Sequence, residues 1–444
     1  MSAQSLAEVE AALADRWPES QLDPSLDRIT DLLHVLGDPQ GAVPVILVAG
    51  TNGKTSTARM IDSLLRSFGL RVGRYTSPHL ESVTERICLG GDPMTDERFV
   101  AAYREIAPYL HLVDARHPHP LSYFETLTAM AYAVFADAPV DVAVVEVGMG
   151  GTWDATNVAD AQVAVVTPVG LDHQAYLGDT VAEIAEEKAG IIVAGCVAVL
   201  AQQTLEAAEV LLTRVAEVGA TVAREGIEFG VVSRSLAVGG QVIDLNGLGG
   251  EYHSVHLTLL GAHQAHNAAV ALAAVEAFLG GGHETLDLDL VRTGFAAATS
   301  PARLEVVRSG PTVLVDAAHN PDGARVLAAA LAEDYSFDRL VGVVGILADK
   351  DARGVLEALE PVLDQVVVTR SSSPRALDPD DLAAVAVSIF GADRVSVAPR
   401  LADAIDEAIG RAEEDGAFSG SGVLVTGSVV TAGEARTLLV RGKG

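Results

Sequence analysis

An apolar strand that runs into a glycine-containing turn and then a helix most constrains how this chain folds. Residues 43–67 read VPVILVAGTNGKTSTARMIDSLLRS, with Gly50 and Gly53 in the turn and Lys54 directly after it. Glycine lets a backbone approach a ligand closely, and the free amides at a helix N-terminus attract anions. The pattern predicts a parallel α/β sheet with a phosphate-binding loop at one edge.

The loop is a shortened form of the eight-residue phosphate loop. The longer motif has a glycine where this chain has Val48, and Gly50 supplies the flexibility instead. Only four of the 30 Lys and Arg residues are lysine, so a retained lysine more often has a specific chemical role. We therefore expect Lys54 to bind the phosphates of ATP, against the alternative of a solvated lysine in a plain turn. The four lysines are Lys54, Lys188, Lys350 and Lys443.

Composition excludes several classes of function. The formal net charge of −30 argues against non-specific binding to nucleic acid or to an anionic membrane surface. Two cysteines, Cys88 and Cys196, are too few for a disulfide framework. The first ten residues lack the basic and apolar regions of a signal peptide, and no apolar run reaches the ~18 residues of a membrane span. We expect a cytoplasmic enzyme.

The length of 444 residues predicts two or three domains, and alternating strand and helix patterns predict an α/β fold. Strands are expected at 45–49, 140–148 and 163–169, because each is nearly continuous in apolar residues, as in a parallel sheet covered on both faces. Helices are expected at 124–135 and 180–189. Residues 221–260 contain glycine pairs between short β-branched runs, which predicts antiparallel hairpins in a small satellite sheet.

A domain boundary is expected near residues 296–301, where a helical stretch ends in AAATSP. We therefore predict an N-terminal ATP-binding domain at 1–299 and a C-terminal Rossmann-like α/β domain at 300–444. The second domain has no phosphate loop of its own. Its expected strands are 312–315, 339–345, 365–369, 394–397 and 422–426, and its expected helices include 323–333 and 401–413.

Polar side chains follow several predicted strands at the edge where ligands of open α/β sheets bind. Glu146 ends one strand and is a natural ligand for Mg²⁺, although carboxylates at strand ends are also often merely solvated. His173 follows the next strand, where a structural histidine is the alternative to a metal ligand. Ser77 follows the expected second strand in a turn sequence, TSPHL.

Three further residues are candidates. Lys188 lies beside two glutamates, so a solvated lysine is the alternative to a cation near phosphates or to a carbamate formed with CO₂. Asp316 begins the segment DAAHNP after a strand, where a helix-start turn is the alternative. Arg303 follows the boundary, where phosphate binding and an interdomain salt bridge are equally expected.

In order along the chain, these segments resemble the folylpolyglutamate synthase and dihydrofolate synthase family, within the wider group of Mur-type amide ligases. The resemblance covers nearly the whole chain, and the ordered set is specific although each motif alone is common. The matching segments are 50–54 (GTNGK), 76–80 (TSPHL), 85–87 (ERI), 146–151 (EVGMGG), 154–157 (DATN), 172–173 (DH), 187–191 (EKAGI), 263–264 (HQ), 267–269 (NAA), 316–321 (DAAHNP) and 349–351 (DKD).

The resemblance implies ATP and Mg²⁺, with two magnesium ions and K⁺ as a further cation. Its metal ligands correspond to Ser77, Glu146 and His173, and its carbamylated lysine corresponds to Lys188. Its ATP contacts correspond to Gly53, Lys54, Thr55, Ser56, Asn267, Arg303 and Asp316. Catalytic roles are implied for Lys54, His173, Lys188, Asp316 and His319.

The resemblance places the pterin-side contacts in residues 26–29, 122–125 and 153–155. The candidates are Asp27, Arg28, Ser122, Tyr123, Phe124, Glu125, Trp153, Asp154 and Ala155. The chain departs from the family at two points. Thr55 replaces a glycine, so either Thr55 or Ser56 supplies the hydroxyl nearest the phosphates. Thr152 and Trp153 stand before Asp154 where the family has arginine, which puts the shape of the folate pocket in question.

The implied reaction is ATP-dependent addition of L-glutamate to dihydropteroate or to the γ-carboxyl of reduced folates through an acyl phosphate. His173 or a nearby carboxylate would accept the proton of the amine, and closure of the second domain would exclude water. The family implies a monomer. One alternative is a Mur-type ligase that acts on a UDP-sugar peptide, and another is a non-catalytic ATP-driven regulator.

Overall fold

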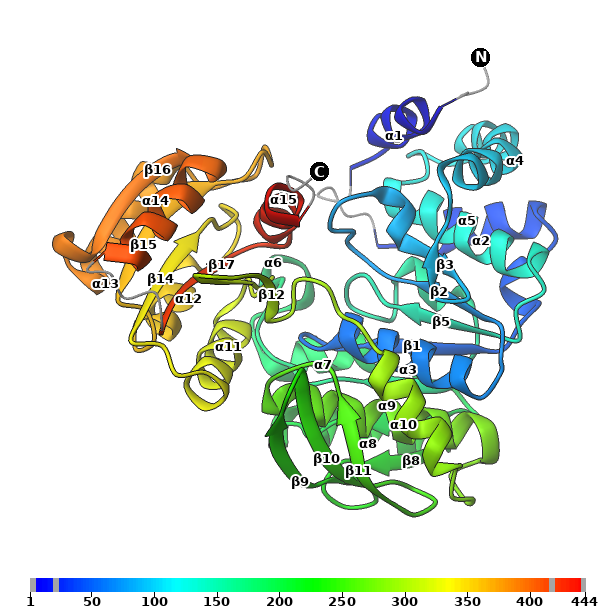
Figure 1. The fold of residues 1–444 in the computed structure, drawn as a ribbon. Coiled ribbons are helices and arrows are strands. Elements are labelled where there is room, and N and C mark those ends of the chain that lie inside the picture. Colours follow the sequence, from blue (N-terminus) through cyan, green and yellow to red (C-terminus); the bar gives the residue numbers. More distant parts are fainter. Residues whose placement is uncertain (1–4, 19–23, 415–419, 441–444) are drawn as a thin grey trace. The chain divides into compact units, whose positions relative to one another are not determined.

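A run of fully buried strands forms the centre of the first sheet. In the computed structural model, which describes residues 5–18, 24–414 and 420–440, every residue of β1 (Val45–Ala49) and of β5 (Val142–Glu146) is buried. Strands that are apolar on both sides need cover on both faces of their sheet. Helices on either side of the sheet provide this cover (Figure 1).

The first sheet has eight strands in the order β4-β3-β2-β5-β1-β6-β7-β8. Pairing is parallel from β2 to β8 and antiparallel at β3 and β4. The carboxyl ends of β2, β5, β1 and β6 therefore lie side by side at one edge. The other strands are β2 (Val72–Tyr75), β3 (Ile87–Leu89), β4 (Asp92–Pro93), β6 (Ala161–Val166), β7 (Val197–Leu200) and β8 (Thr221–Arg224).

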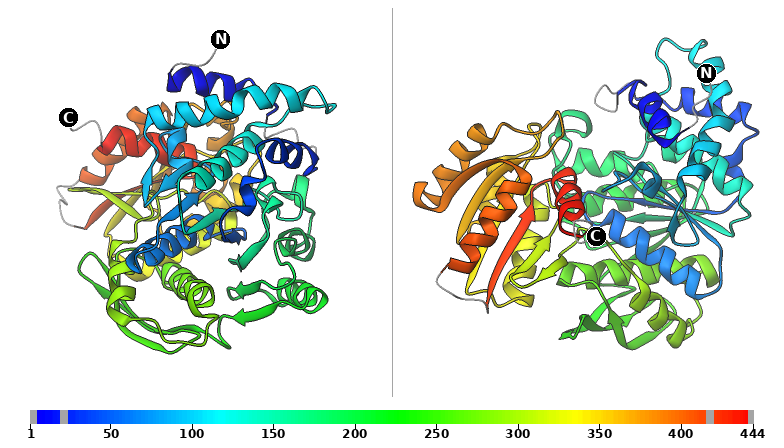
Figure 2. Two further views of the ribbon diagram at one scale, coloured as in Figure 1. Left: turned by 90° about the vertical axis from the view of Figure 1, so that its right-hand side faces the viewer. Right: turned by 45° about the horizontal axis from the view of Figure 1, so that its top comes forward.

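The helices around this sheet form two groups. Helix α3 packs against β1, β2 and β5 and contacts α10, whereas α5 packs against β2 and contacts α2 and α4, as two further views show (Figure 2). The helices are α1 (Leu6–Ala14), α2 (Asp27–Val35), α3 (Lys54–Ser67), α4 (Asp96–Asp114), α5 (Tyr123–Asp137), α6 (Gln174–Leu177), α7 (Val181–Ala189), α8 (Leu205–Val218), α9 (Ala262–Gly280) and α10 (Leu288–Ala297). Short 3₁₀ helices lie at Pro39–Gly41, Val83–Arg86 and Ala155–Val158.

The satellite sheet has three strands in the order β11-β10-β9: β9 (Gly230–Ala237), β10 (Gly240–Asn246) and β11 (Glu251–Leu257). The prediction of a small separate sheet is confirmed. Its expected start at residue 221 is wrong, because β8 pairs in parallel with β7 and belongs to the first sheet. A four-residue strand at a sheet edge has the same β-branched pattern as a hairpin strand, so the pattern did not separate them.

The second half of the chain forms a six-stranded sheet in the order β12-β13-β17-β14-β15-β16. Pairing is parallel except at β12, an antiparallel edge strand that the sequence did not indicate. The α/β class with a Rossmann-like second sheet is confirmed. Its strands are β12 (Glu305–Ser309), β13 (Thr312–Val315), β14 (Arg339–Val344), β15 (Gln365–Arg370), β16 (Val395–Arg400) and β17 (Ser421–Thr426). Its helices are α11 (Pro321–Asp334), α12 (Ala352–Leu359), α13 (Pro379–Phe390), α14 (Leu401–Glu413), α15 (Val429–Val440) and the 3₁₀ helix Ala392–Arg394.

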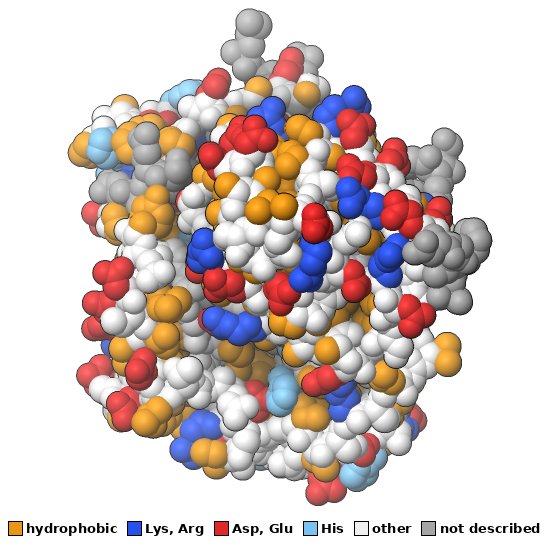
Figure 3. Space-filling model, turned by 90° about the vertical axis from the view of Figure 1, so that its left-hand side faces the viewer, with side chains coloured by type: hydrophobic (Ala, Val, Ile, Leu, Met, Phe, Trp, Pro, Cys, Tyr) orange, Lys and Arg blue, Asp and Glu red, His pale blue; other side chains and the backbone are white. Residues whose placement is uncertain are grey.

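The chain divides into two compact units. Unit 1 comprises Met1–Ala237, Val242–Thr258 and Ala265–Thr299, and unit 2 comprises Val238–Gln241, Leu259–Gln264 and Ser300–Gly444. Acidic and basic side chains are mixed on the face shown in Figure 3, where the described residues form no large basic area. No helix in the described ranges is long and apolar enough to cross a membrane.

A buried ion pair joins helix α3 to strand β2 of the first sheet. The Asp62 carboxylate is fully buried and accepts hydrogen bonds from Arg74 on β2 and from the Nε of Arg66, the latter at 3.0 Å. The side chain of Arg74 is only 4% exposed, and it also donates to the Sγ of Cys88 at 3.0 Å. This network ties the helix that follows the glycine loop to the neighbouring strand.

We expect Asp62→Ala to lower the free energy of unfolding by about 3–5 kcal/mol, because it leaves the Arg74 guanidinium buried without its carboxylate. Urea unfolding followed by circular dichroism measures the effect. Arg71→Ala, which removes a solvent-exposed pair with Asp141, is the matched control and should leave the midpoint nearly unchanged. Equal midpoints for the two variants would contradict the importance of the buried pair.

Candidate active site

Two glycines shape the loop between β1 and α3. Gly50 has φ +140°, and a Cβ there would lie 1.9 Å from the Oγ1 of Thr167. Gly53 has φ +89°, and a Cβ there would lie 2.6 Å from the Oδ1 of Asn267. Side chains at either position would therefore collide with the neighbouring β6 loop or α9. The same contact places Asn267 beside the loop. Gly53 and Asn267 are both predicted to contact ATP, and the structure places them side by side.

Lys54 begins α3 and turns back across the loop. Its Nζ donates to the backbone oxygens of Gly50 at 3.0 Å and Thr51 at 3.2 Å. The loop is fixed from its other side, because the Thr51 hydroxyl donates to the Gly170 oxygen and accepts from the Gly170 amide, both at 3.0 Å. The Lys54 ammonium group, the closely packed loop backbone and the N-terminus of α3 therefore lie together. Groups of these kinds bind phosphates in proteins.

The Glu146 carboxylate joins three segments at the same edge. It is 2% exposed, and its Oε1 accepts from the Thr55 hydroxyl at 2.8 Å while its Oε2 accepts from the Ser77 amide at 3.3 Å. Ser56 is buried instead. The structure therefore brings together Ser77, Glu146 and the loop, and it directs the Thr55 hydroxyl toward the carboxylate.

His173 lies after β6 with a left-handed backbone, φ +53°. Its amide donates to the Oδ1 of Asp172 at 2.8 Å, and its Nε2 lies 3.9 Å from Asp172 Oδ2. The side chain is partly exposed at the same sheet edge. Among the described residues, no group of three or more His, Cys, Asp or Glu side chains is arranged to hold a metal. The predicted metal ligands include a serine, Ser77, so they form a mixed set of oxygen and nitrogen donors.

Lys188 is a buried cation of unit 1. It is 4% exposed at the end of α7. Burial, with the charge of Lys54, lowers the pKa of Lys188 to about 7, although Asp172, Asp154 and Glu187 oppose the shift. The lysine that sequence patterns alone would place on a solvated face is therefore a buried amine in the field of the phosphate-loop lysine.

Close backbone contacts hold the Lys188 turn in place. A Cβ on Gly151 would lie 2.5 Å from the Glu187 oxygen, and a Cβ on Gly190 would lie 2.2 Å from the Thr152 hydroxyl. The Thr152 amide donates to the Glu187 oxygen at 2.9 Å. The EVGMGG and EKAGI segments are thus packed against one another through their glycines.

The predicted pterin-side residues divide into structural and accessible groups. The buried Arg28 Nε donates to Glu125 Oε1 at 3.1 Å, and Glu125 also caps α5 by accepting from the Ser122 amide at 2.7 Å. Asp27 is exposed at the start of α2. The half-buried Phe124 ring covers Gly148, where a Cβ would lie 2.5 Å from its Cζ.

Asp154 is engaged within its own loop. Burial raises the pKa of Asp154, and its carboxylate accepts from the Met149 amide at 2.8 Å and from the Thr156 amide at 2.9 Å. Trp153 is half-buried against Gly150, whereas Ala155 is buried. The carboxylate of Asp154 therefore shapes the loop, and Trp153 presents the more accessible surface.

An arginine–histidine pair at the TSPHL segment had no role assigned from the sequence. Arg86 is buried, donates from Nε to the Nδ1 of His79 at 3.0 Å, and lies 5.0 Å from the ring centre of Tyr123. Burial and the charge of Arg86 lower the pKa of His79 to about 4, so His79 is neutral near pH 7. The ERI motif was the sequence signal for this contact, which links the TSPHL segment to the predicted pterin-side residue Tyr123.

In unit 2, Asp316 organises the turn before β12. Its Oδ2 accepts from the Leu304 amide at 2.9 Å and its Oδ1 from the Ala318 amide at 2.8 Å. Burial raises the pKa of Asp316, and the charge of Arg303 opposes this shift. His319 lies close by, with its Nδ1 3.0 Å from the Ala317 oxygen. The structure therefore gathers the three predicted residues of unit 2, Arg303, Asp316 and His319, in one turn region.

Comparisons with known proteins agree with this arrangement. Residues 48–275 match the Mur ligase middle domain, and residues 302–429 match the glutamate ligase domain of Mur ligases. The chain is 54% identical to the dihydrofolate synthase/folylpolyglutamate synthase of Mycobacterium tuberculosis, over 98% of this chain and 94% of that protein. The chain belongs to the dihydrofolate synthase/folylpolyglutamate synthase family of Mur ligases. Members of this family are ATP-dependent ligases, and the chain is therefore an enzyme.

Solved structures extend the similarity to three dimensions. A Mycobacterium tuberculosis folylpolyglutamate synthase complexed with ADP is 55% identical, with a TM-score of 0.94 and 98% of each chain covered. An Escherichia coli protein, FolC, solved in complex with DHPP and ADP, is 31% identical, with a TM-score of 0.87 and full coverage of both chains. The family fold thus holds from one end of the chain to the other.

We expect Gly53→Ala to weaken ATP binding by about tenfold or more, because the new Cβ meets both an unfavourable φ and the Asn267 side chain. Gly69→Ala at the far end of α3 is the control. Gly69 has a similar φ of +84° but open space around it, so that variant carries the backbone strain without the collision. Titration with a fluorescent ATP analogue compares the two, and equal affinities would remove the Asn267 contact from the account.

Proposed function

We propose that this chain adds L-glutamate to dihydropteroate, to the γ-carboxyl of reduced folate polyglutamates, or to both, with ATP converted to ADP and phosphate. The observation that carries the proposal is the convergence of Lys54, Thr55, Glu146 and Ser77 at one sheet edge in a chain of this family. The relatives named for folate substrates support this choice over a UDP-sugar peptide. A non-catalytic regulator would give the buried Lys188 and the Asp316 turn no role.

The first step activates an inert carboxylate. A substrate carboxylate oxygen attacks the γ-phosphorus of ATP, the bond to the β–γ bridging oxygen breaks, and ADP leaves. Lys54 and the amides after Gly53 hold the phosphates in line for this transfer and neutralise the charge that develops on them. Asn267 lies against Gly53 and can position the nucleotide.

The predicted Mg²⁺ ligands fit a hard cation in part. Glu146 supplies a buried carboxylate, the Thr55 hydroxyl and the Ser77 amide donate to it, and Ser77 carries a hydroxyl in the same segment, so the candidate donor set is rich in oxygen. His173 would add nitrogen from the β6 loop. A bound ion would neutralise phosphate charge during the transfer. The expectations of two magnesium ions and of K⁺ remain predictions.

The buried amine of Lys188 has the properties that carbamate formation requires. CO₂ reacts with the neutral amine, and a pKa of about 7 makes a large fraction of Lys188 neutral near pH 7. The product is an anion, which removes the repulsion between Lys188 and Lys54 that the free ammonium would suffer. The buried, glycine-walled turn keeps this group away from bulk water, where a carbamate is lost.

In the second step the glutamate amine attacks the acyl phosphate carbonyl, phosphate leaves, and an amide forms. A base must accept one proton from the amine. His173 is the first candidate because it is partly exposed, with Asp172 beside it to orient the ring. Arg303, Asp316 and His319 are proposed to bind nucleotide and to assist this coupling. A monomer and a cytoplasmic location also remain predictions.

We expect Lys54→Ala to reduce glutamate-dependent ADP release at least a thousandfold, because the phosphates lose their only mobile charge in the loop. A coupled ADP assay with dihydropteroate and with tetrahydrofolate as separate acceptors measures the loss. Lys54→Arg is the control, because it keeps the positive charge but replaces the ammonium group with a guanidinium. This variant should retain only a small part of the wild-type ADP release. Turnover near wild type in Lys54→Ala would remove this residue from the mechanism.

The carbamate has its own test. Enzyme equilibrated with ¹³C-bicarbonate should show one carbamate carbon signal that is absent from Lys188→Arg. Because the neutral amine is needed, this signal should grow as the pH rises through about 7. Lys188→Ala should lose most activity and regain part of it with short-chain carboxylic acids. A signal of equal size in Lys188→Arg would contradict the assignment.

A further inference from the structure

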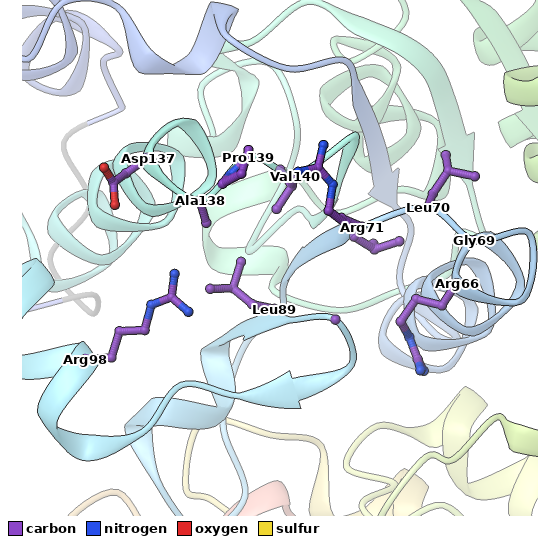
Figure 4. Close-up of a pocket in the computed structure, with 12 residues that line it drawn as sticks. Arg66, Gly69, Leu70, Arg71, Leu89, Arg98, Asp137, Ala138, Pro139 and Val140 are labelled. Carbon is purple, nitrogen blue, oxygen red and sulfur yellow. The ribbon is translucent and has the colours of Figure 1, made fainter.

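A solvent-open surface cavity of about 610 Å³ lies at the amino ends of β2 and β5 in unit 1. It is formed by the end of α3, the turn into β2, the end of β3, the start of α4 and the segment between α5 and β5 (Figure 4). This volume is in the range of small-molecule sites. None of the residues assigned to the ligase reaction lines it.

The lining reverses the charge balance of the chain. Acidic residues outnumber Lys and Arg by 60 to 30 in the whole sequence. The cavity instead has three arginines, Arg66, Arg71 and Arg98, and one acid, Asp137. Arg66 and Arg71 are paired with acids outside this lining, so the positive charge that an anionic occupant could meet here is that of Arg98.

The three arginines differ in how far they are already paired. Arg71 binds Asp141 through two nitrogens, at 3.1 and 2.6 Å, and Arg66 donates to Asp62 at 3.0 Å. The Arg98 guanidinium forms no hydrogen bond or ion pair with any residue in the described ranges. In Figure 4 the Arg98 side chain extends from α4 toward Leu89 and Ala138, while Arg66 points away. Arg98 is therefore the cation available to a ligand.

The rest of the wall is apolar. Between Arg98 and Arg71 lie Leu89, Ala138 and Pro139, as Figure 4 shows, and Val140 continues this surface. An inorganic anion would leave this surface uncovered. A ligand with an apolar group attached to its anionic group would cover it.

We propose that this cavity binds a small organic anion, in which a carboxylate or phosphate monoester meets Arg98 and an apolar group packs on Leu89 and Pro139. The site is distinct from the phosphate loop. Helix α3 separates Lys54 from Arg66 by twelve residues, about 18 Å along the helix axis. The proposal rests on no part of the ligase assignment, so the two stand or fall separately.

Isothermal titration of the full chain, with saturating ADP present to occupy the phosphate loop, tests the proposal. The probes are phenyl phosphate and phenylacetate, with inorganic phosphate and benzyl alcohol for comparison. At least one of the two aromatic anions should bind at one site per chain, weaken as salt is raised, and bind more tightly than either comparison compound. Binding of inorganic phosphate as tight as that of phenyl phosphate would overturn the role of the apolar wall.

Variants then locate the site. Arg98→Gln should weaken binding about tenfold or more, and Arg98→Lys should retain part of it. Arg104→Gln, at another exposed arginine of α4, should bind as wild type does. Thermal melting curves check that all three variants are folded. No saturable binding to wild type, or equal affinity in Arg98→Gln and Arg104→Gln, would overturn the proposal.

Discussion

The Glu146 carboxylate joins three segments of the site that are separate in the sequence. It ends a central buried strand, accepts the Thr55 hydroxyl from the helix after the loop, and accepts the Ser77 amide from the turn after β2. This arrangement requires β5 to lie between β1 and β2 in parallel register, as it does. Apolar residues on both faces of β1 and β5 favour positions in the middle of the sheet, and polar groups at the carboxyl ends of these strands therefore meet at one edge.

Positive charge concentrated at one place, rather than the net charge, allows this acidic chain to bind an anionic substrate. The sequence carries a formal −30, yet the loop concentrates an ammonium, a helix N-terminus and close backbone amides at one edge. Burial, together with repulsion from Lys54, lowers the pKa of Lys188 at this edge. The structure thus places a weakly basic amine near the phosphate loop without any change in the overall acidity of the protein.

Sequence reasoning predicted the elements with strong local signals. Strand β1 and helix α14 have the predicted bounds, and the α/β class follows from continuous apolar strands. Weak signals were the ones missed: β8 and β12 are short edge strands whose pairing depends on distant partners. At the site, strand-end logic selected Glu146, but it could not show that the loop itself occupies the oxygens of Asp154, or that Lys188 is buried. Those outcomes depend on packing between distant segments.

The reaction path is tested most directly by the fate of carboxylate oxygen. Dihydropteroate labelled with ¹⁸O in both carboxylate positions is incubated with enzyme, ATP and L-glutamate, and the phosphate released is examined by mass spectrometry. Activation through an acyl phosphate predicts one ¹⁸O atom in each phosphate and one retained in the new amide. Phosphate free of ¹⁸O, formed together with amide product, would contradict the account.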